Sequence, residues 1–87
     1  MHRCDDVIVY SEPTCRPCRL VKDYLRSKGV RFTEVDISQD EAEREALVRM
    51  TGEMSVPVTQ YGDRFVVGFS RRRLDELLEC AATMAVF

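Results

Sequence analysis

The sequence predicts an α/β domain in which a four-stranded mixed sheet is flanked by three helices, in the order β-α-β-α-β-β-α. Three observations predict this class. Short β-branched runs alternate with segments of helical periodicity in the first half of the chain, which is typical of parallel strands joined by a helix. Two later runs are separated only by Gly62-Asp63, which indicates a hairpin. The 87 residues contain no linker and no repeat, so we expect a single domain over residues 1–87.

The first strand is predicted at Val7–Tyr10, a β-branched and aromatic run bounded by turn residues. A helix is expected to follow Cys15, because apolar residues then recur on one helical face. These residues are Leu20, Val21, Tyr24 and Leu25. Lys28-Gly29 supplies a basic last turn and a glycine just beyond it, which favours the end of the helix there.

Residues 30–36 alternate apolar and polar side chains and predict a second strand, parallel to the first through a right-handed connection. The run Ser38-Gln39-Asp40-Glu41 matches a capping box, so a second helix is expected to begin there and to end at Thr51-Gly52. Its apolar positions are sparse, which favours a surface helix packed by one stripe. They are Ala42, Ala46, Leu47 and Met50.

The second half of the chain predicts a hairpin and a final helix. Pro57 opens a run that continues to Tyr61, a position where a strand tolerates proline, and Arg64–Val67 forms the second strand of the hairpin. Ser70 is expected to cap the last helix. The apolar face of that helix is Leu74, Leu77, Leu78 and Ala81. Residues 83–87 are apolar and predict no particular element.

Two cysteines three positions apart stand where the first strand gives way to the first helix. Unpaired N–H groups in the first turn of a helix favour a nearby anion, and helix N-termini and Cys-x-x-Cys motifs lower the pKa of a cysteine thiol. Cys15 is therefore the candidate nucleophile. Cys18, one turn inside the helix, is the candidate resolving thiol that attacks a mixed disulfide. Pro17 suits the first turn because it lacks an N–H that would be unpaired there.

Composition limits the other function classes. A formal net charge of −2 argues against a nucleic-acid binder, and 45% hydrophobic with 32% charged residues is ordinary for a soluble domain. No apolar run reaches membrane-spanning length, and the N-terminus lacks the apolar segment of a signal peptide. We therefore expect a cytoplasmic protein without nucleic-acid or membrane partners.

The four cysteines also allow a disulfide scaffold or a zinc site. A disulfide scaffold is disfavoured by the missing signal peptide and the strong helix and strand patterns. A zinc site is disfavoured because Cys4, Cys80 and His2 are scattered along the sequence. Cys80 is expected on the apolar side of the last helix, and Cys4 is expected to be a thiol without an assigned role. Redox use of Cys15 and Cys18 is the favoured interpretation, with no metal.

Taken together, these residues resemble the glutaredoxins of the thioredoxin superfamily, and among them the NrdH-type redoxins, over nearly the whole chain. Tyr10–Cys18 looks like the active-site stretch of that family, and Val56-Pro57-Val58 like its cis-proline motif. Val67-Gly68-Phe69-Ser70 stands where NrdH-type proteins carry Ser-Gly-Phe. The resemblance implies a thioredoxin-like fold, with Cys15 and Cys18 as catalytic residues. It also implies that substrate is bound by Arg16, Pro17, Val56, Pro57, Gly68, Phe69, Ser70 and Arg71.

Three departures from glutathione-using glutaredoxins concern the reductant. Glu12 occupies the place of a usual lysine or arginine and would repel the carboxylates of glutathione. Pro17 replaces a usual aromatic residue, and Phe69 replaces a usual glycine. The run Arg71-Arg72-Arg73 argues in the other direction, because positive charge at a helix N-terminus gains nothing locally. That run is suited to glutathione carboxylates or an acidic partner, or it is simply a solvated face.

The sequence thus favours a monomeric dithiol–disulfide oxidoreductase that reduces protein disulfides and is itself reduced by thioredoxin reductase. Ribonucleotide reductase is the substrate that the NrdH-type resemblance implies. The main alternative is a glutathione-dependent glutaredoxin acting on glutathione mixed disulfides, with glutathione as a co-substrate and no resident cofactor. An iron–sulfur carrier, with a cluster held by Cys15 and glutathione between two chains, is a further alternative and is disfavoured by Glu12.

Overall fold

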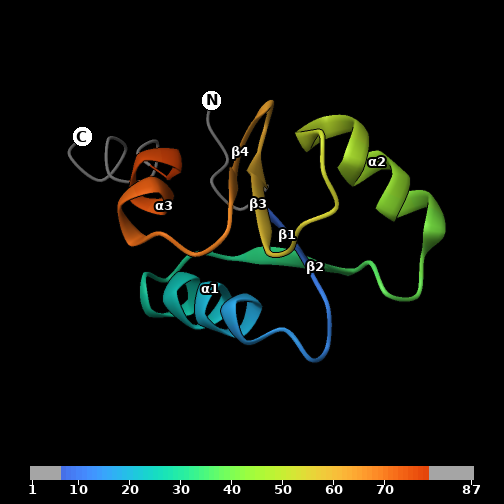
Figure 1. Ribbon diagram of the computed structural model, residues 1–87. Coiled ribbons are helices and arrows are strands. Elements are labelled where there is room, and N and C mark those ends of the chain that lie inside the picture. Colours follow the sequence, from blue (N-terminus) through green and yellow to red (C-terminus); the bar gives the residue numbers. More distant parts are fainter. Residues whose placement is uncertain (1–6, 79–87) are drawn as a thin grey trace.

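The computed structural model describes residues 7–78 of the protein, and this part of the chain folds into one sheet with three helices (Figure 1). The strands are β1 (Val7–Ser11), β2 (Phe32–Asp36), β3 (Val58–Tyr61) and β4 (Arg64–Val67). The helices are α1 (Arg16–Ser27), α2 (Glu41–Thr51) and α3 (Arg71–Leu77). The order β-α-β-α-β-β-α and the four-stranded mixed sheet are therefore as predicted.

The strands lie in the order β2-β1-β3-β4. β1 pairs in parallel with β2, as a strand-helix-strand unit requires, and antiparallel with β3. In the register Tyr10 pairs with Val58, and Val58 pairs with Val67. The carboxyl end of β1, the start of β3 and the end of β4 are consequently at one end of the sheet. The turn after β1, the loop before β3 and the turn after β4 therefore lie at the same end of the sheet.

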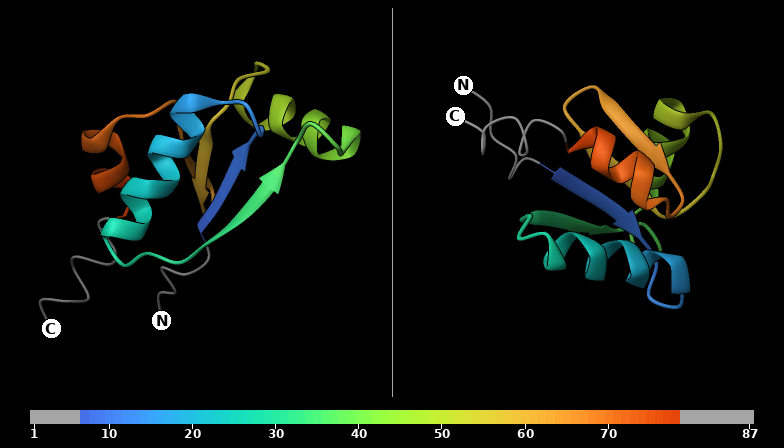
Figure 2. Two further views of the ribbon diagram at one scale, coloured as in Figure 1. Left: turned by 90° about the horizontal axis from the view of Figure 1, so that it is seen from below. Right: turned by 90° about the vertical axis from the view of Figure 1, so that its left-hand side faces the viewer.

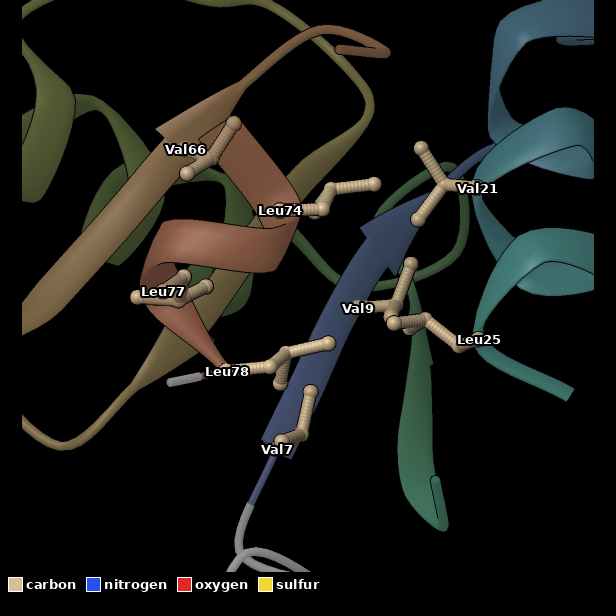
Figure 3. Packing of buried hydrophobic residues seen from close by; sticks show 8 residues of the cluster. All are labelled: Val7, Val9, Val21, Leu25, Val66, Leu74, Leu77 and Leu78. Carbon is tan, nitrogen blue, oxygen red and sulfur yellow. The ribbon is translucent and has the colours of Figure 1, made fainter. Parts of the chain in front are cut away.

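One face of the sheet carries the larger core cluster, in which β1 is covered by α1 and α3. Figure 3 shows Val7 and Val9 of β1 between the side chains of the two helices. The buried members are Val7, Val9, Val21, Leu25, Val66, Leu74, Leu77 and Leu78. Full burial of a Val or Leu side chain contributes roughly 1.5–3 kcal/mol, so this cluster fixes α1 on the sheet.

The opposite face carries a smaller cluster beneath α2, which stands apart from α1 and α3 in Figure 1 and in the left view of Figure 2. Its buried members are Tyr10, Ile37, Leu47 and Val58. Leu47 is the one buried residue of α2, and Val48 is exposed. The sparse apolar stripe expected from the sequence is thus confirmed.

α2 begins two residues later than the capping-box pattern suggested. The helix cap is Asp40, whose carboxylate accepts a hydrogen bond from the Glu43 N–H at 3.1 Å. Ser38 is engaged elsewhere, because both its hydroxyl and its N–H donate to the Asp36 carboxylate. That local turn uses the donors of Ser38 and leaves Asp40 to cap the helix. Gly52, with φ 87°, ends the helix in the left-handed region, as predicted.

The second strand is also shorter than predicted. It begins at Phe32 rather than Val30, because the Val30 N–H donates to the Leu25 carbonyl at 3.0 Å and completes the end of α1. β1 extends one residue further than expected, to Ser11. β3 begins at Val58, one residue after Pro57.

α3 is capped by Ser70, whose hydroxyl accepts from the Arg73 N–H at 3.3 Å, as predicted. Leu74 and Leu77 are buried on its inner face. The expectations for Cys4, Cys80, Ala81 and residues 83–87 lie outside the described residues. No helix within residues 7–78 is both long enough and apolar enough to cross a membrane.

Candidate active site

The two cysteines of the motif lie at the junction of β1 and α1. Cys15 is the N-cap of α1, with extended backbone angles, and its Sγ accepts a hydrogen bond from the Cys18 N–H at 3.1 Å. The Cys15 N–H itself donates to the Glu12 carbonyl at 3.3 Å, which closes the turn after β1. Cys15 Sγ is therefore placed where the unpaired N–H groups of the first helical turn favour negative charge.

Cys15 and Cys18 differ in exposure. Cys15 is half-buried, whereas Cys18 is fully buried on the side of α1 that faces the sheet. Their Cα atoms are 5.2 Å apart and their sulfurs form a disulfide, so this is the oxidised form of the pair. A partly exposed first cysteine and a fully buried second one fit the roles of nucleophile and resolving thiol. The assignment of the two roles remains a prediction.

The loop containing Pro57 lies at the same end of the sheet as the dithiol turn, because Val58 pairs with Tyr10. The Val56-Pro57 peptide bond is cis, as the resemblance implies, and Pro57 is buried. The Pro57 carbonyl accepts a hydrogen bond from the Gly68 N–H at 2.8 Å. The loop before β3 is thus joined directly to the turn after β4.

Gly68, Phe69 and Ser70 form the turn from β4 to α3. Gly68 has φ 84°, a conformation that favours glycine. The Phe69 ring is half-buried and meets Tyr24 of α1 edge to face, with ring centroids 6.1 Å apart. Ser70 is occupied as the cap of α3. Phe69 and Ser70 therefore have structural contacts of their own beside any part in substrate binding.

The sequence and the fold both match known proteins. The sequence matches the glutaredoxin family model over residues 7–66. The chain belongs to the glutaredoxin family. A glutaredoxin-like 8.6 kDa protein of the rubredoxin operon of Clostridium pasteurianum is 37% identical over 71 residues, which are 82% of this chain and 95% of that protein.

Solved structures agree with the family assignment. The glutaredoxin of Archaeoglobus fulgidus superposes with a TM-score of 0.80 at 29% identity, covering 85% of this chain and 86% of its own. NrdH-redoxin from Escherichia coli, a glutaredoxin-like protein with a thioredoxin-like activity profile, gives a TM-score of 0.75 at 25% identity, covering 83% and 93%. The resemblance and the thioredoxin-like fold inferred from the sequence are confirmed. This glutaredoxin is a thiol–disulfide oxidoreductase with Cys15 and Cys18 at disulfide distance.

The arginines near the site of this glutaredoxin are exposed. Arg16 precedes Pro17 in the first turn of α1, and both side chains are exposed. Arg71 is exposed at the start of α3 and forms no ion pair with another described residue, whereas Arg72 lies 3.7 Å from the Glu76 carboxylate.

A cluster of polar side chains that no sequence motif indicates joins β1, α1 and β2. The Ser11 hydroxyl donates to Glu34 Oε2 at 2.7 Å, and Lys22 Nζ lies 2.7 Å from the same oxygen. The hydrogen bonds from Lys22 and from Ser11 lower the pKa of the Glu34 carboxyl below its ordinary value. The sequence contains no motif for this cluster, because its three residues are far apart along the chain and come together only through the parallel pairing of β1 with β2.

Tyr10, the first residue of the active-site stretch, is another titratable group whose pKa the fold shifts. Its hydroxyl donates to Gln60 Oε1 at 3.1 Å. Burial raises the pKa of the Tyr10 phenol, and the negative charge of Glu43 raises it further. Tyr10 is consequently neutral near pH 7 and acts as a packing and hydrogen-bonding residue. Residues 7–78 contain no group of three or more His, Cys, Asp or Glu side chains arranged to hold a metal ion.

Proposed function

We propose that this glutaredoxin reduces disulfides in other proteins and is itself reduced by thioredoxin reductase. The observation that carries the proposal is the pairing of an accessible Cys15 at the cap of α1 with a buried Cys18 one turn later. In such a pair the more exposed thiol attacks the substrate disulfide first, and the buried thiol then attacks the mixed disulfide. The two steps together transfer two electrons to the substrate.

The proposed cycle has two exchanges. The Cys15 thiolate attacks one sulfur of the substrate disulfide, forms a mixed disulfide and releases the first substrate thiolate. The Cys18 thiolate then attacks Cys15 Sγ, closes the Cys15–Cys18 disulfide and releases the second substrate thiolate. Two electrons pass from the dithiol to the substrate, and the reductase returns two electrons from NADPH.

The choice of reductase over glutathione rests on the dithiol turn and on similarity. Glu12 places a carboxylate three residues before Cys15, where it would repel the carboxylates of glutathione. Pro17 stands in the first turn between the cysteines, as in thioredoxins. Escherichia coli NrdH-redoxin, a structural neighbour of this chain, has a thioredoxin-like activity profile. Ribonucleotide reductase is the protein substrate that this likeness suggests.

The test supplies NADPH with either thioredoxin reductase or glutathione plus glutathione reductase and follows reduction of insulin. We expect turnover with the first system and little with the second. Cys15→Ser should abolish activity, and Cys18→Ser should accumulate the mixed disulfide. Turnover with glutathione alone would overturn the choice of reductant.

The second candidate is a glutathione-dependent glutaredoxin. Arg71 favours it as a site for a glutathione carboxylate, because its side chain is exposed and forms no ion pair with another residue of the range 7–78. In that case Cys18→Ser retains the removal of glutathione from mixed disulfides, because Cys15 alone suffices. Arg71→Glu should then raise the KM for the glutathionylated substrate. A brown colour after anaerobic purification would instead point to the iron–sulfur carrier, and gel filtration with light scattering tests the proposed monomer.

A further inference from the structure

One carboxylate oxygen holds both ends of the chain segment that contains the dithiol. Ser11, the last residue of β1, donates to Glu34 Oε2 at 2.7 Å, and Lys22 of α1 reaches the same oxygen at 2.7 Å. Cys15 and Cys18 lie between these two attachment points in sequence. We call Ser11, Lys22 and Glu34 the clasp.

The clasp is partly shielded from water, unlike the other ion pairs of the described residues. Ser11 is 1% exposed, and the side chains of Lys22 and Glu34 are 20% and 40% exposed. Ser11 is further fixed by its carbonyl, which accepts from the Ile37 N–H at 3.0 Å. By contrast, Asp23 and Arg26 on the same helix pair at 3.4 Å with both side chains more than 60% exposed. A carboxylate that is only partly exposed and makes two short bonds restrains the chain more than such a largely exposed pair does.

The segment between the attachment points has few other polar restraints on the turn itself. The Cys15 N–H donates to the Glu12 carbonyl at 3.3 Å, while Pro13 and Thr14 are exposed. When the disulfide is reduced, its covalent restraint on the turn and the start of α1 is lost. The clasp involves neither sulfur, so its bonds do not depend on the disulfide.

We infer that Glu34 is a positioning residue, which holds the reduced Cys15 and Cys18 close enough to close their disulfide efficiently. Without the clasp, the reduced segment gains more freedom than the oxidised one, in which the disulfide still limits motion. Oxidation then costs more conformational entropy, and the effective concentration of one thiol at the other falls. The inference rests on the dithiol chemistry of the proposed function and holds for either reductant.

An electrostatic effect makes a different prediction for the same residues. Glu34 also neutralises Lys22, which lies four residues after Cys18 on α1. If only charge mattered, Glu34→Gln would favour thiolates and Lys22→Met would disfavour them, so the two substitutions would shift disulfide formation in opposite directions. If positioning matters, both substitutions weaken disulfide formation.

The experiment equilibrates the full chain with mixtures of reduced and oxidised glutathione and quantifies the Cys15–Cys18 pair by alkylation and mass spectrometry. In this reaction the two thiols give two electrons and two protons to glutathione disulfide, which leaves as two glutathione molecules. The equilibrium constant is the effective concentration of the thiols. We expect Glu34→Gln and Lys22→Met each to lower it by about two- to fivefold, the range of a partly exposed ion pair. Lys22→Arg should retain most of the wild-type value.

Asp23→Asn is the matched control, because it removes an exposed ion pair from the same helix and should leave the constant unchanged. An unchanged constant in Glu34→Gln, or opposite shifts in Glu34→Gln and Lys22→Met, would overturn the inference. If Glu34→Gln fails to fold, Lys22→Met is compared with Lys22→Arg instead. An equal decrease of the equilibrium constant in both variants would refute the inference. A wild-type chain that forms no Cys15–Cys18 disulfide would instead refute the proposed function.

Discussion

Reducing the Cys15–Cys18 disulfide should lower the stability of the domain by an amount that follows from the size of the closed loop. The two cysteines are three positions apart, so the bond closes a loop of about four residues. In the chain-entropy model, opening such a loop returns about 6 cal/mol/K to the unfolded chain, or about 1.9 kcal/mol at 25 °C. This is a factor of about 25 in the unfolding equilibrium constant.

The perturbation is reduction by a phosphine at pH 5, and the assay is urea unfolding followed by circular dichroism. At this pH free cysteine thiols, with a pKa near 8.5, are protonated, so thiolates contribute least to the stability of the reduced form. In thermal unfolding of the same samples, about 1.9 kcal/mol corresponds to a decrease in Tm of roughly 8–15 °C for a domain of this size. The m-value should be nearly unchanged, because so short a disulfide loop restricts very little of the surface that unfolding exposes.

The control is the double variant Cys15→Ser, Cys18→Ser, which keeps Cys4 and Cys80. Its stability should not respond to the phosphine. Equal stability of the oxidised and reduced wild-type forms at pH 5, or a more stable reduced form, would refute the reasoning. Such a result would mean that relaxation of the folded turn offsets the entropy of the unfolded chain.

Three further predictions concern the scaffold and the clasp. Leu25→Ala removes a fully buried side chain that packs α1 on the sheet, and it should cost about 2–5 kcal/mol in urea unfolding; a loss below about 1 kcal/mol would contradict the packing. Gly52→Ala meets no atom within 4 Å but requires φ near +87°, so a loss of about 1–2 kcal/mol is expected from backbone strain alone, and no loss would contradict it. The fold lowers the pKa of Glu34, so ionised Glu34 stabilises the folded protein at pH values above about 4.3, the ordinary pKa of a glutamate in an unfolded chain. This stabilisation is lost as the pH falls through the lower pKa of the folded protein. The stability difference between wild type and Glu34→Gln should therefore shrink from pH 6 to pH 3, and a difference that grows in acid would contradict the assignment.

The local signals in this sequence were strong enough to determine the fold class. Alternation, helical periodicity and the Gly62-Asp63 turn signal placed every strand and helix of residues 7–78, because these patterns are local to each element. The boundaries were less well determined. Ser38 and Val30 were misassigned because hydrogen bonds to Asp36 and to the Leu25 carbonyl, which residue spacing does not reveal, decide where α2 and β2 begin.

The sequence by itself also determined the dithiol, since Cys15 and Cys18 are local to one turn and one helix start. Only the tertiary structure decided that Cys18 is fully buried while Cys15 is half-buried, because that difference depends on which face of α1 meets the sheet. The clasp, too, could not be predicted from the sequence. Glu34 meets Ser11 and Lys22 only because β2 pairs in parallel beside β1 and α1 packs across both, so long-range strand pairing rather than any motif creates it.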